Sequence, residues 1–365
     1  MSYPGISFSL NVPSRTLLSV FAFVTFVRSG KSTNIAYFHE QEKELVHTGN
    51  LIPVWVLILL SKTGQPPARA ATCRCMQQPG AWNDWWGIGW LRFHNQLVDE
   101  VVQADKGQGF DLIFYGDSIT EDWRGTSGGV PWPIGTGSDK VFQKHFAAKC
   151  RAEVLAIAGD QVGHLWWRIL NGELPAVHQP RVFTMLIGTN DLNAADCNHN
   201  ETELLATVPG IAARVGEIVR ILRTAAPQAH VLLQAVLPRG AAWIGLTQWK
   251  WPNRFAKPIW ALNAKFQEMA AVDPWVHYVD CGLPFVQQTK TGYVLDANLL
   301  PDGLHPNAAG MDVMASCLEA AIAPLMRDDG SIGSIKLSRV IASDIVASID
   351  STAVNSSVLE RELGN

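Results

Sequence analysis

Short apolar runs alternate with longer amphipathic segments through the middle of this 365-residue chain, and this alternation constrains its fold more than any other feature. The segment at 210–225 is the clearest helix, because Ile211, Val215, Ile218 and Leu222 recur at helical spacing, and Pro209 suits its first turn. Strands joined by such helices form a parallel sheet that is covered on both faces. We expect strands at 112–115, 154–158, 182–187, 231–237 and 276–280, and further helices at 89–104, 141–150, 164–171, 259–271 and 308–323.

Both ends of the chain differ in composition from the middle. Residues 1–39 contain no Asp or Glu, and apolar runs at 17–27 and 51–60 are shorter than the ~18 residues of a membrane-spanning helix. Ala68-Arg69-Ala70 has the small-x-small pattern of a signal-peptidase site. We expect a secretory or organelle address, with the cytoplasm as the alternative, and weak membrane association through the apolar runs. The predicted parts are a targeting or poorly ordered extension over 1–80, a folded domain over 81–326 and a polar tail over 327–365.

Charge and cysteine content exclude some classes of partner. The net charge is -4, the pI is near 6.2 and no run of like charges occurs, so we expect no nucleic-acid partner. The six cysteines match neither a small disulfide scaffold nor a zinc site, and we interpret them as scattered thiols. No Gly-x-Gly-x-x-Gly follows the first predicted strand, which argues against a dinucleotide-binding protein.

A serine stands directly after the first predicted strand, in Gly116-Asp117-Ser118. In parallel α/β sheets, ligands bind beyond the carboxyl ends of the strands, where this hydroxyl would lie. A serine becomes a nucleophile only with a base within hydrogen-bonding distance. Taken alone, Gly-Asp-Ser is weak evidence for a nucleophile, because small polar residues end many strands, and a polar residue in a turn is the better explanation.

The second and third predicted strands end in residues that can donate hydrogen bonds. Gly159 offers an unobstructed backbone N–H, and Asn190 offers a side-chain amide. The alternatives are a helix-initiating turn that Asp160 caps, and a capping or turn role for Asn190.

Asp302 and His305 lie three residues apart in a Pro- and Gly-containing loop before the last predicted helix. This spacing lets the carboxylate bind the imidazole Nδ1 and leaves Nε2 free to accept the Ser118 proton. A surface Asp-x-x-His pair is the alternative. We expect no other of the ten histidines to have an aspartate at this spacing in a comparable loop.

Together, these segments resemble a known family. The motifs GDSIT, AGD, GTND and DGLHPN, at 116–120, 158–160, 188–191 and 302–307, resemble the four sequence blocks of the GDSL esterases, also called SGNH hydrolases. The resemblance extends over 82–325, and 159–174 and 232–240 are most similar to the catalytic subunits of the platelet-activating factor acetylhydrolases. It implies a three-layer α/β/α, flavodoxin-like fold with a central parallel sheet of about five strands.

The resemblance also implies roles for the individual residues. Ser118 would be the nucleophile, His305 the general base and Asp302 the residue that orients it. The oxyanion hole would consist of the backbone N–H groups of Ser118 and Gly159 and the side chain of Asn190. The implied reaction is ester hydrolysis through an acyl-serine, without a metal or an organic cofactor.

The segment at 241–260 departs from the family pattern, because it is extended and rich in tryptophan. Trp243, Trp249 and Trp251 are candidates for substrate contact, as parts of a lid, a sugar-stacking platform or a membrane-contacting flap. The alternative is that these rings pack against the domain's own surface.

We expect the substrate to be a small acyl ester of acetyl type, on a lipid-like or glycan-linked alcohol. The alternatives are a lipase or phospholipase for longer acyl chains, and a non-catalytic binding protein with an SGNH fold. The resemblance is compatible with a dimer, but the residues themselves specify no oligomeric state.

Overall fold

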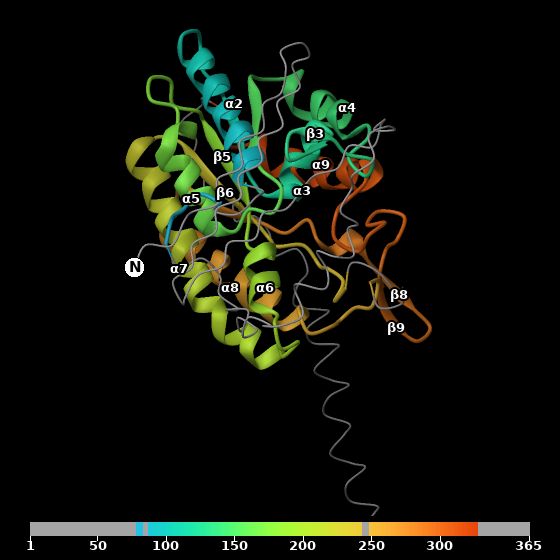
Figure 1. The fold of residues 1–365 in the computed structure, drawn as a ribbon. Coiled ribbons are helices and arrows are strands. Elements are labelled where there is room, and N and C mark those ends of the chain that lie inside the picture. Colours follow the sequence, from blue (N-terminus) through green and yellow to red (C-terminus); the bar gives the residue numbers. More distant parts are fainter. Residues whose placement is uncertain (1–77, 83–86, 243–247, 328–365) are drawn as a thin grey trace, which may run out of the picture. The chain divides into compact units, whose positions relative to one another are not determined.

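A five-stranded parallel sheet forms the centre of the domain in the computed structural model, which describes residues 78–82, 87–242 and 248–327 (Figure 1). The strand order is β4-β1-β5-β6-β7, and every neighbouring pair is parallel. The five predicted strands are confirmed with shifted ends: β1 Leu112–Gly116, β4 Ala152–Ala156, β5 Val182–Leu186, β6 His230–Gln234 and β7 Val276–Val279. Every residue of β1 and β5 is buried, as expected for central strands covered on both faces.

Helices cover both faces of this sheet (Figure 1). On one face α7 packs against α5 and α8, and on the other α4 packs against α9, so the predicted three-layer architecture is confirmed. The α-helices are α2 Gly87–Asp105, α3 Ser118–Glu121, α4 Ser138–Phe142, α5 Val162–Arg168, α6 Thr189–Ala195, α7 Glu201–Ala225, α8 Ala256–Val272 and α9 Ala308–Ile322. Shorter helical segments are η1 Asp122–Arg124, η2 Gln143–Ala147, η3 Ile169–Glu173 and η4 Leu283–Phe285, and two small hairpins pair β2 Thr126–Ser127 with β3 Val130–Pro131 and β8 Val286–Thr289 with β9 Gly292–Leu295.

Helix α7 begins earlier than its hydrophobic pattern predicted. The side chain of Asn200 caps it by accepting from the backbone N–H groups of Thr202 and Glu203. Pro209 therefore lies inside the helix, and its predicted place in the first turn is wrong. Leu204 and Val208 are buried and extend the apolar face toward the N-terminus, which stabilises the added turns.

A disulfide joins Cys281, just after β7, to Cys317 in α9, with 5.9 Å between the Cα atoms. The interpretation of these two cysteines as scattered thiols is therefore wrong, while Cys150 is a free thiol. The expected targeting extension and polar tail fall mainly on 1–77 and 328–365, which lie outside the described residues. No helix among the described residues is long and apolar enough to cross a membrane.

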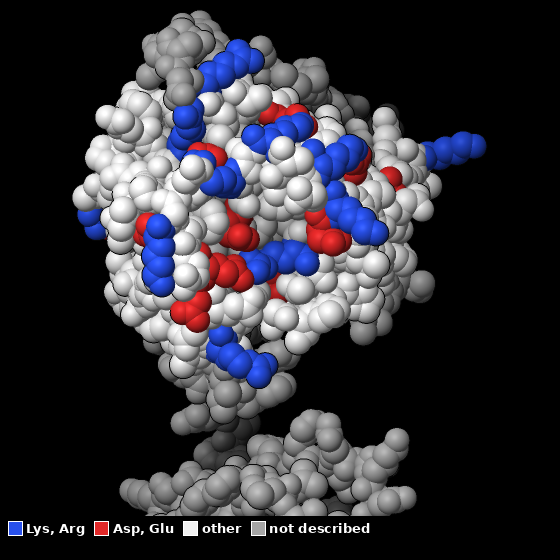
Figure 2. Space-filling view, turned by 90° about the horizontal axis from the view of Figure 1, so that it is seen from above, with Lys and Arg blue, Asp and Glu red and all other residues white. Residues whose placement is uncertain are grey.

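Basic and acidic side chains are intermixed over one face of the molecule, as Figure 2 shows. In the described part of the chain, ion pairs such as Lys144 with Asp312 and Arg220 with Glu217 are exposed. Among the described residues, this face therefore presents no large patch of a single sign.

Candidate active site

Ser118 is the first residue of α3, at the carboxyl end of β1. The preceding Asp117 caps the helix by accepting from the backbone N–H of Ile119, 3.1 Å away. The tight turn requires glycine at 116, because a Cβ there would lie 2.6 Å from the carbonyl oxygen of Leu186. The sequence thus places the serine hydroxyl at the sheet edge, where only 8% of the residue is exposed.

His305 connects Ser118 to Asp302 in a continuous hydrogen-bonded chain. Its Nε2 lies 2.9 Å from Ser118 Oγ, and its Nδ1 lies 2.6 Å from Asp302 Oδ2. In the tautomer that donates Nδ1–H to the carboxylate, Nε2 carries the lone pair that accepts the serine proton. The structure therefore brings these three residues together, although Ser118 and His305 are 187 positions apart in the sequence.

Asp302 is held in place by the turn that it begins. Its Oδ1 accepts from the backbone N–H groups of Leu304 and His305, at 2.9 and 2.7 Å. Burial alone would raise the pKa of Asp302, but hydrogen bonds from the His305 ring and from these two N–H groups outweigh it and lower the pKa. Asp302 is thus a fixed, negatively charged partner for the imidazole.

Gly159 and Asn190 follow the strands on either side of β1, since β4 and β5 both pair with it. Gly159 has a φ of 84°, in the left-handed region that favours glycine. Asn190 lies in the first turn of α6, and its Nδ2 donates to the backbone oxygen of Asp160 at 3.0 Å. That bond uses one amide hydrogen and leaves the second for another acceptor.

Asp160 is not the helix cap that the sequence suggested, because Gln161 occupies that position. Instead, the buried Asp160 carboxylate accepts from Trp90 Nε1 at 2.6 Å and from Arg168 Nε at 2.7 Å. Arg168 is itself fully buried. This charged network was not predicted from the sequence, although an arginine within the apolar stretch HLWWRIL is a signal for a buried ion pair.

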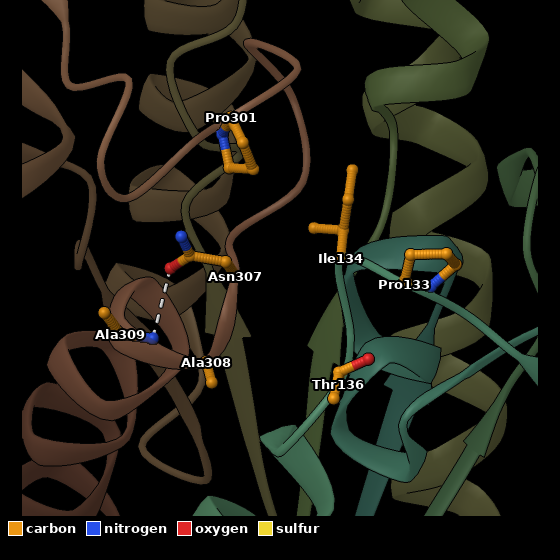
Figure 3. A pocket seen from close by; sticks show the side chains of 7 residues that line it. All are labelled: Pro133, Ile134, Thr136, Pro301, Asn307, Ala308 and Ala309. Atoms are coloured by element: carbon orange, nitrogen blue, oxygen red, sulfur yellow. Dashed lines mark hydrogen bonds between the residues drawn. The ribbon is translucent and has the colours of Figure 1, made fainter.

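An open groove of about 480 Å³ lies between the segment at 133–136 and the residues Pro301 and 307–309, which come before and after Asp302 and His305 in the sequence (Figure 3). Pro301 directly precedes Asp302, and the ring of Trp132 lies edge-on to His305 with 6.2 Å between centroids. Neither Ser118 nor His305 is among the lining residues. None of the seven lining side chains is charged: Pro133, Ile134 and Thr136 face Pro301, Asn307, Ala308 and Ala309 across the groove.

The tryptophan-rich segment packs against the turn that carries Asp302. Trp249 Nε1 donates to the carbonyl oxygen of Leu300 at 3.2 Å, and Gly240 N donates to that of Gly303 at 2.7 Å. Trp251 is only 7% exposed and lies edge-on to Trp260 in the core. The ring of Trp251 is thus used in packing, while contact of Trp249 and Trp251 with the substrate stays a prediction; Trp243 lies outside the described residues.

A second Asp-x-x-His pair lies at Asp196 and His199, between α6 and α7 in a stretch without Pro or Gly, so this spacing does not by itself single out Asp302 and His305. Asp196 Oδ2 lies 3.1 Å from His199 Nδ1. Within the ranges that the structure describes, no group of three or more His, Cys, Asp or Glu side chains is arranged to hold a metal ion.

The model of the GDSL-like Lipase/Acylhydrolase family matches residues 114–313, more than half of the chain. The chain belongs to this family. Membership confirms the predicted enzyme class, an ester hydrolase, and agrees with the five-stranded parallel sheet.

Among curated relatives, the platelet-activating factor acetylhydrolase IB subunit alpha2 of Gallus gallus is 29% identical over 157 residues, which are 41% of this chain and 52% of that protein. Subunit alpha1 of Homo sapiens is 25% identical over 251 residues, covering 67% of this chain and 87% of that protein.

Among solved structures, a GDSL-like lipase from Bacteroides thetaiotaomicron is 21% identical with a TM-score of 0.43, covering 63% of this chain and 97% of that one. An acetylxylan esterase mutant from Geobacillus stearothermophilus is 18% identical with a TM-score of 0.44, covering 60% and 95%.

Proposed function

We propose that this chain is a serine esterase in which Ser118 is the nucleophile, His305 the general base and Asp302 the residue that orients the imidazole. One observation carries the proposal: Ser118 Oγ, His305 Nε2, His305 Nδ1 and Asp302 Oδ2 form an unbroken chain with contacts of 2.9 and 2.6 Å. This geometry is what a serine needs to lose its proton as it attacks.

In the proposed reaction, Ser118 Oγ forms a bond to the ester carbonyl carbon while its proton passes to His305 Nε2. The carbonyl electron pair moves onto oxygen, and this oxyanion accepts from the backbone N–H groups of Ser118 and Gly159 and from the remaining amide hydrogen of Asn190. Each such donor contributes about 3 kcal/mol to transition-state stabilisation. The carbon–oxygen bond to the alcohol then breaks, and the alcohol leaves with the proton from His305.

Hydrolysis of the acyl-serine repeats these steps with water. His305 removes a proton from the water, which attacks the acyl carbon, and the same donors hold the second oxyanion. Collapse of this intermediate releases the carboxylic acid and returns the proton to Ser118 Oγ. The ester is thus cleaved by one water molecule, and no oxidant or reductant is consumed.

We propose an ester with a small, uncharged acyl group of acetyl type as the substrate. The two curated relatives are acetylhydrolase subunits by name, and the groove lined by Pro301 and Asn307, on either side of Asp302 and His305 in the sequence, carries no charged lining residue. Its proline, isoleucine and alanine side chains suit an apolar part of the substrate, on either the acyl or the alcohol side. A lipase for longer acyl chains is the competing outcome of the test below.

The test is hydrolysis of p-nitrophenyl esters from acetyl to decanoyl by the full chain, with Ser118→Ala as the control. We expect kcat/KM to be highest for acetyl or butyryl and to fall with longer chains, and the variant to be inactive on all of them. A rise toward octanoyl or decanoyl would replace the acetyl proposal with the lipase. A folded wild type that hydrolyses none of these esters would contradict the esterase proposal.

A further inference from the structure

We propose that Arg168 is a positioning residue for the oxyanion hole, because its buried guanidinium joins the two turns that present the backbone donors. This inference rests on the proposed function, since it concerns the same Ser118-centred site. It adds a residue from helix α5 that touches neither Ser118 nor the groove in any contact that the structure describes.

The guanidinium contacts both strand ends that carry the backbone donors. Arg168 Nη2 donates to the carbonyl oxygen of Gly116 at 3.0 Å, two residues before Ser118. Arg168 Nε donates to Asp160 Oδ2 at 2.7 Å, in the residue that follows Gly159. One planar group therefore holds the ends of β1 and β4 at a fixed separation.

The same network extends to the third donor. The backbone oxygen of Asp160 accepts from Asn190 Nδ2 at 3.0 Å, so the position of Asp160 sets the orientation of that amide. Trp90 Nε1 donates to the second carboxylate oxygen of Asp160 at 2.6 Å. Asp160 thus connects Arg168 to both Gly159 and Asn190, and Trp90 holds its carboxylate from the side of α2.

The far side of the guanidinium is anchored as well. Arg168 Nη1 donates to Glu173, and Glu173 Oε1 lies 2.7 Å from His94 Nδ1. The side chains of Arg168, Asp160 and Glu173 are all fully buried. Such an ion-pair network is often no more stabilising than an apolar cluster of equal volume, so stability alone explains it poorly.

The buried network of Arg168 is better explained as a device that fixes the positions of the oxyanion-hole donors. An oxyanion hole works when its donors are already in place before charge develops, and a small displacement of a catalytic group lowers the rate strongly. Lysine cannot replace Arg168 in this role, because one ammonium group cannot span Gly116, Asp160 and Glu173 in a single plane.

Two variants test the proposal with different risks of misfolding. Arg168→Lys keeps the charge but loses the planar fork, and we expect kcat for p-nitrophenyl acetate to fall about 100-fold. Trp90→Phe removes the indole hydrogen bond to Asp160 together with part of the ring volume, and we expect a fall of about tenfold. In both variants KM should change less than kcat, because the ground-state ester makes weaker use of the oxyanion donors.

A matched control comes from Trp123, which is equally buried. Its indole N–H has no hydrogen-bond partner among the described residues, so Trp123→Phe removes similar volume without removing a hydrogen bond. We expect its kcat to stay within about twofold of wild type.

The affinity of a phenylboronic acid, which forms a tetrahedral adduct with the active-site serine, provides a second measurement. It should weaken in parallel with kcat in Arg168→Lys and Trp90→Phe. Folding is checked by circular dichroism and thermal unfolding, and Trp90→Phe keeps the proposal testable if Arg168→Lys does not fold.

The outcomes separate the inference from the function on which it rests. Wild-type activity that does not depend on Ser118 would remove the proposed function and the inference with it. Ser118-dependent wild-type activity, together with a folded Trp90→Phe variant of unchanged kcat and boronate affinity, would overturn the inference alone. Equal losses in Trp90→Phe and Trp123→Phe would also overturn it, because the effect would then be one of general packing.

Discussion

Two Asp-x-x-His pairs occur in this domain, and they show what separates a candidate catalytic base from an ordinary ion pair. In both, the histidine Nδ1 lies near the aspartate Oδ2, at 2.6 Å for His305 with Asp302 and 3.1 Å for His199 with Asp196. The His305 side chain is 5% exposed and its Nε2 faces Ser118, whereas the His199 side chain is 71% exposed.

The two carboxylates also differ in their other partners. Asp302 accepts from the backbone of its own turn, through Leu304 N and His305 N. Asp196 accepts from Arg254, whose Nε lies 2.8 Å from both carboxylate oxygens. The same spacing therefore gives an imidazole directed at a serine in one place and a surface histidine beside an Asp–Arg pair in the other. Burial and the group that faces Nε2 make the difference.

The largest expected effect distinguishes the two histidines. Ser118→Ala and His305→Ala should each lower kcat by about 10⁶-fold, because either removes the nucleophile–base pair. His199→Ala should leave kcat within about twofold of wild type, since its ring is exposed and makes no described contact with Ser118. The measurement is steady-state hydrolysis of p-nitrophenyl acetate, and a comparable loss in His199→Ala would erase the distinction between the pairs.

The two aspartates should differ next. Asp302→Asn should lower kcat by about 10⁴-fold, because the amide no longer fixes the imidazole tautomer that accepts the serine proton. Asp196→Asn should leave kcat unchanged in the same assay. If Asp302→Asn retained full activity, Asp302 would be only a turn-forming residue.

The pH dependence of kcat/KM sharpens the comparison further. Because hydrogen bonds outweigh burial and lower the pKa of Asp302, its carboxylate keeps its charge at pH values at which an ordinary aspartate is partly protonated. We therefore expect that protonation of Asp302 adds to no loss of activity above the ordinary aspartate pKa of about 3.9, so a logarithmic plot of kcat/KM should fall there with a slope no steeper than one. A slope near two above pH ~4 would show that Asp302 is also being protonated. Asp196→Asn should not move this profile.

The smallest expected effect is on the free energy of unfolding, and here the pair that does not affect kcat, Asp196 with His199, is the one whose substitution matters. Asp196→Asn should lower the free energy of unfolding by about 2 kcal/mol, because it weakens a largely buried hydrogen-bonded pair with Arg254. His199→Ala should change it by less than about 0.5 kcal/mol. Urea denaturation measures both changes. An unchanged stability in Asp196→Asn would show that the contact between Asp196 and Arg254 does not stabilise the fold.

Much of the sheet and the site could be predicted from local sequence. The apolar runs of β1 and β5 are continuous because both faces are buried, and each ends in a motif that marks the carboxyl edge. Ser118, Gly159 and Asn190 could therefore be assigned to one edge of the sheet from their positions after the predicted strands.

The partners of buried polar groups could not be predicted in this way. Periodicity shows that a face is buried, but it does not show that Arg168 meets Gly116, or that Trp249 supports the Leu300 turn. The Cys281–Cys317 disulfide and the early start of α7 depend equally on tertiary packing and on a cap outside the apolar pattern. The Asp-x-x-His spacing alone also did not identify the pair that faces Ser118, because Asp196 and His199 have the same spacing.

The most direct test of the account is the site at which a fluorophosphonate reacts with the full chain, located by mass spectrometry of peptides. Such a reagent captures a serine that a neighbouring base activates. We predict that the wild type is labelled on Ser118, that His199→Ala is labelled equally and that His305→Ala is not labelled. Labelling of folded wild type at another residue, or equal labelling of His305→Ala, would contradict the assignment of Ser118 and His305 as nucleophile and base.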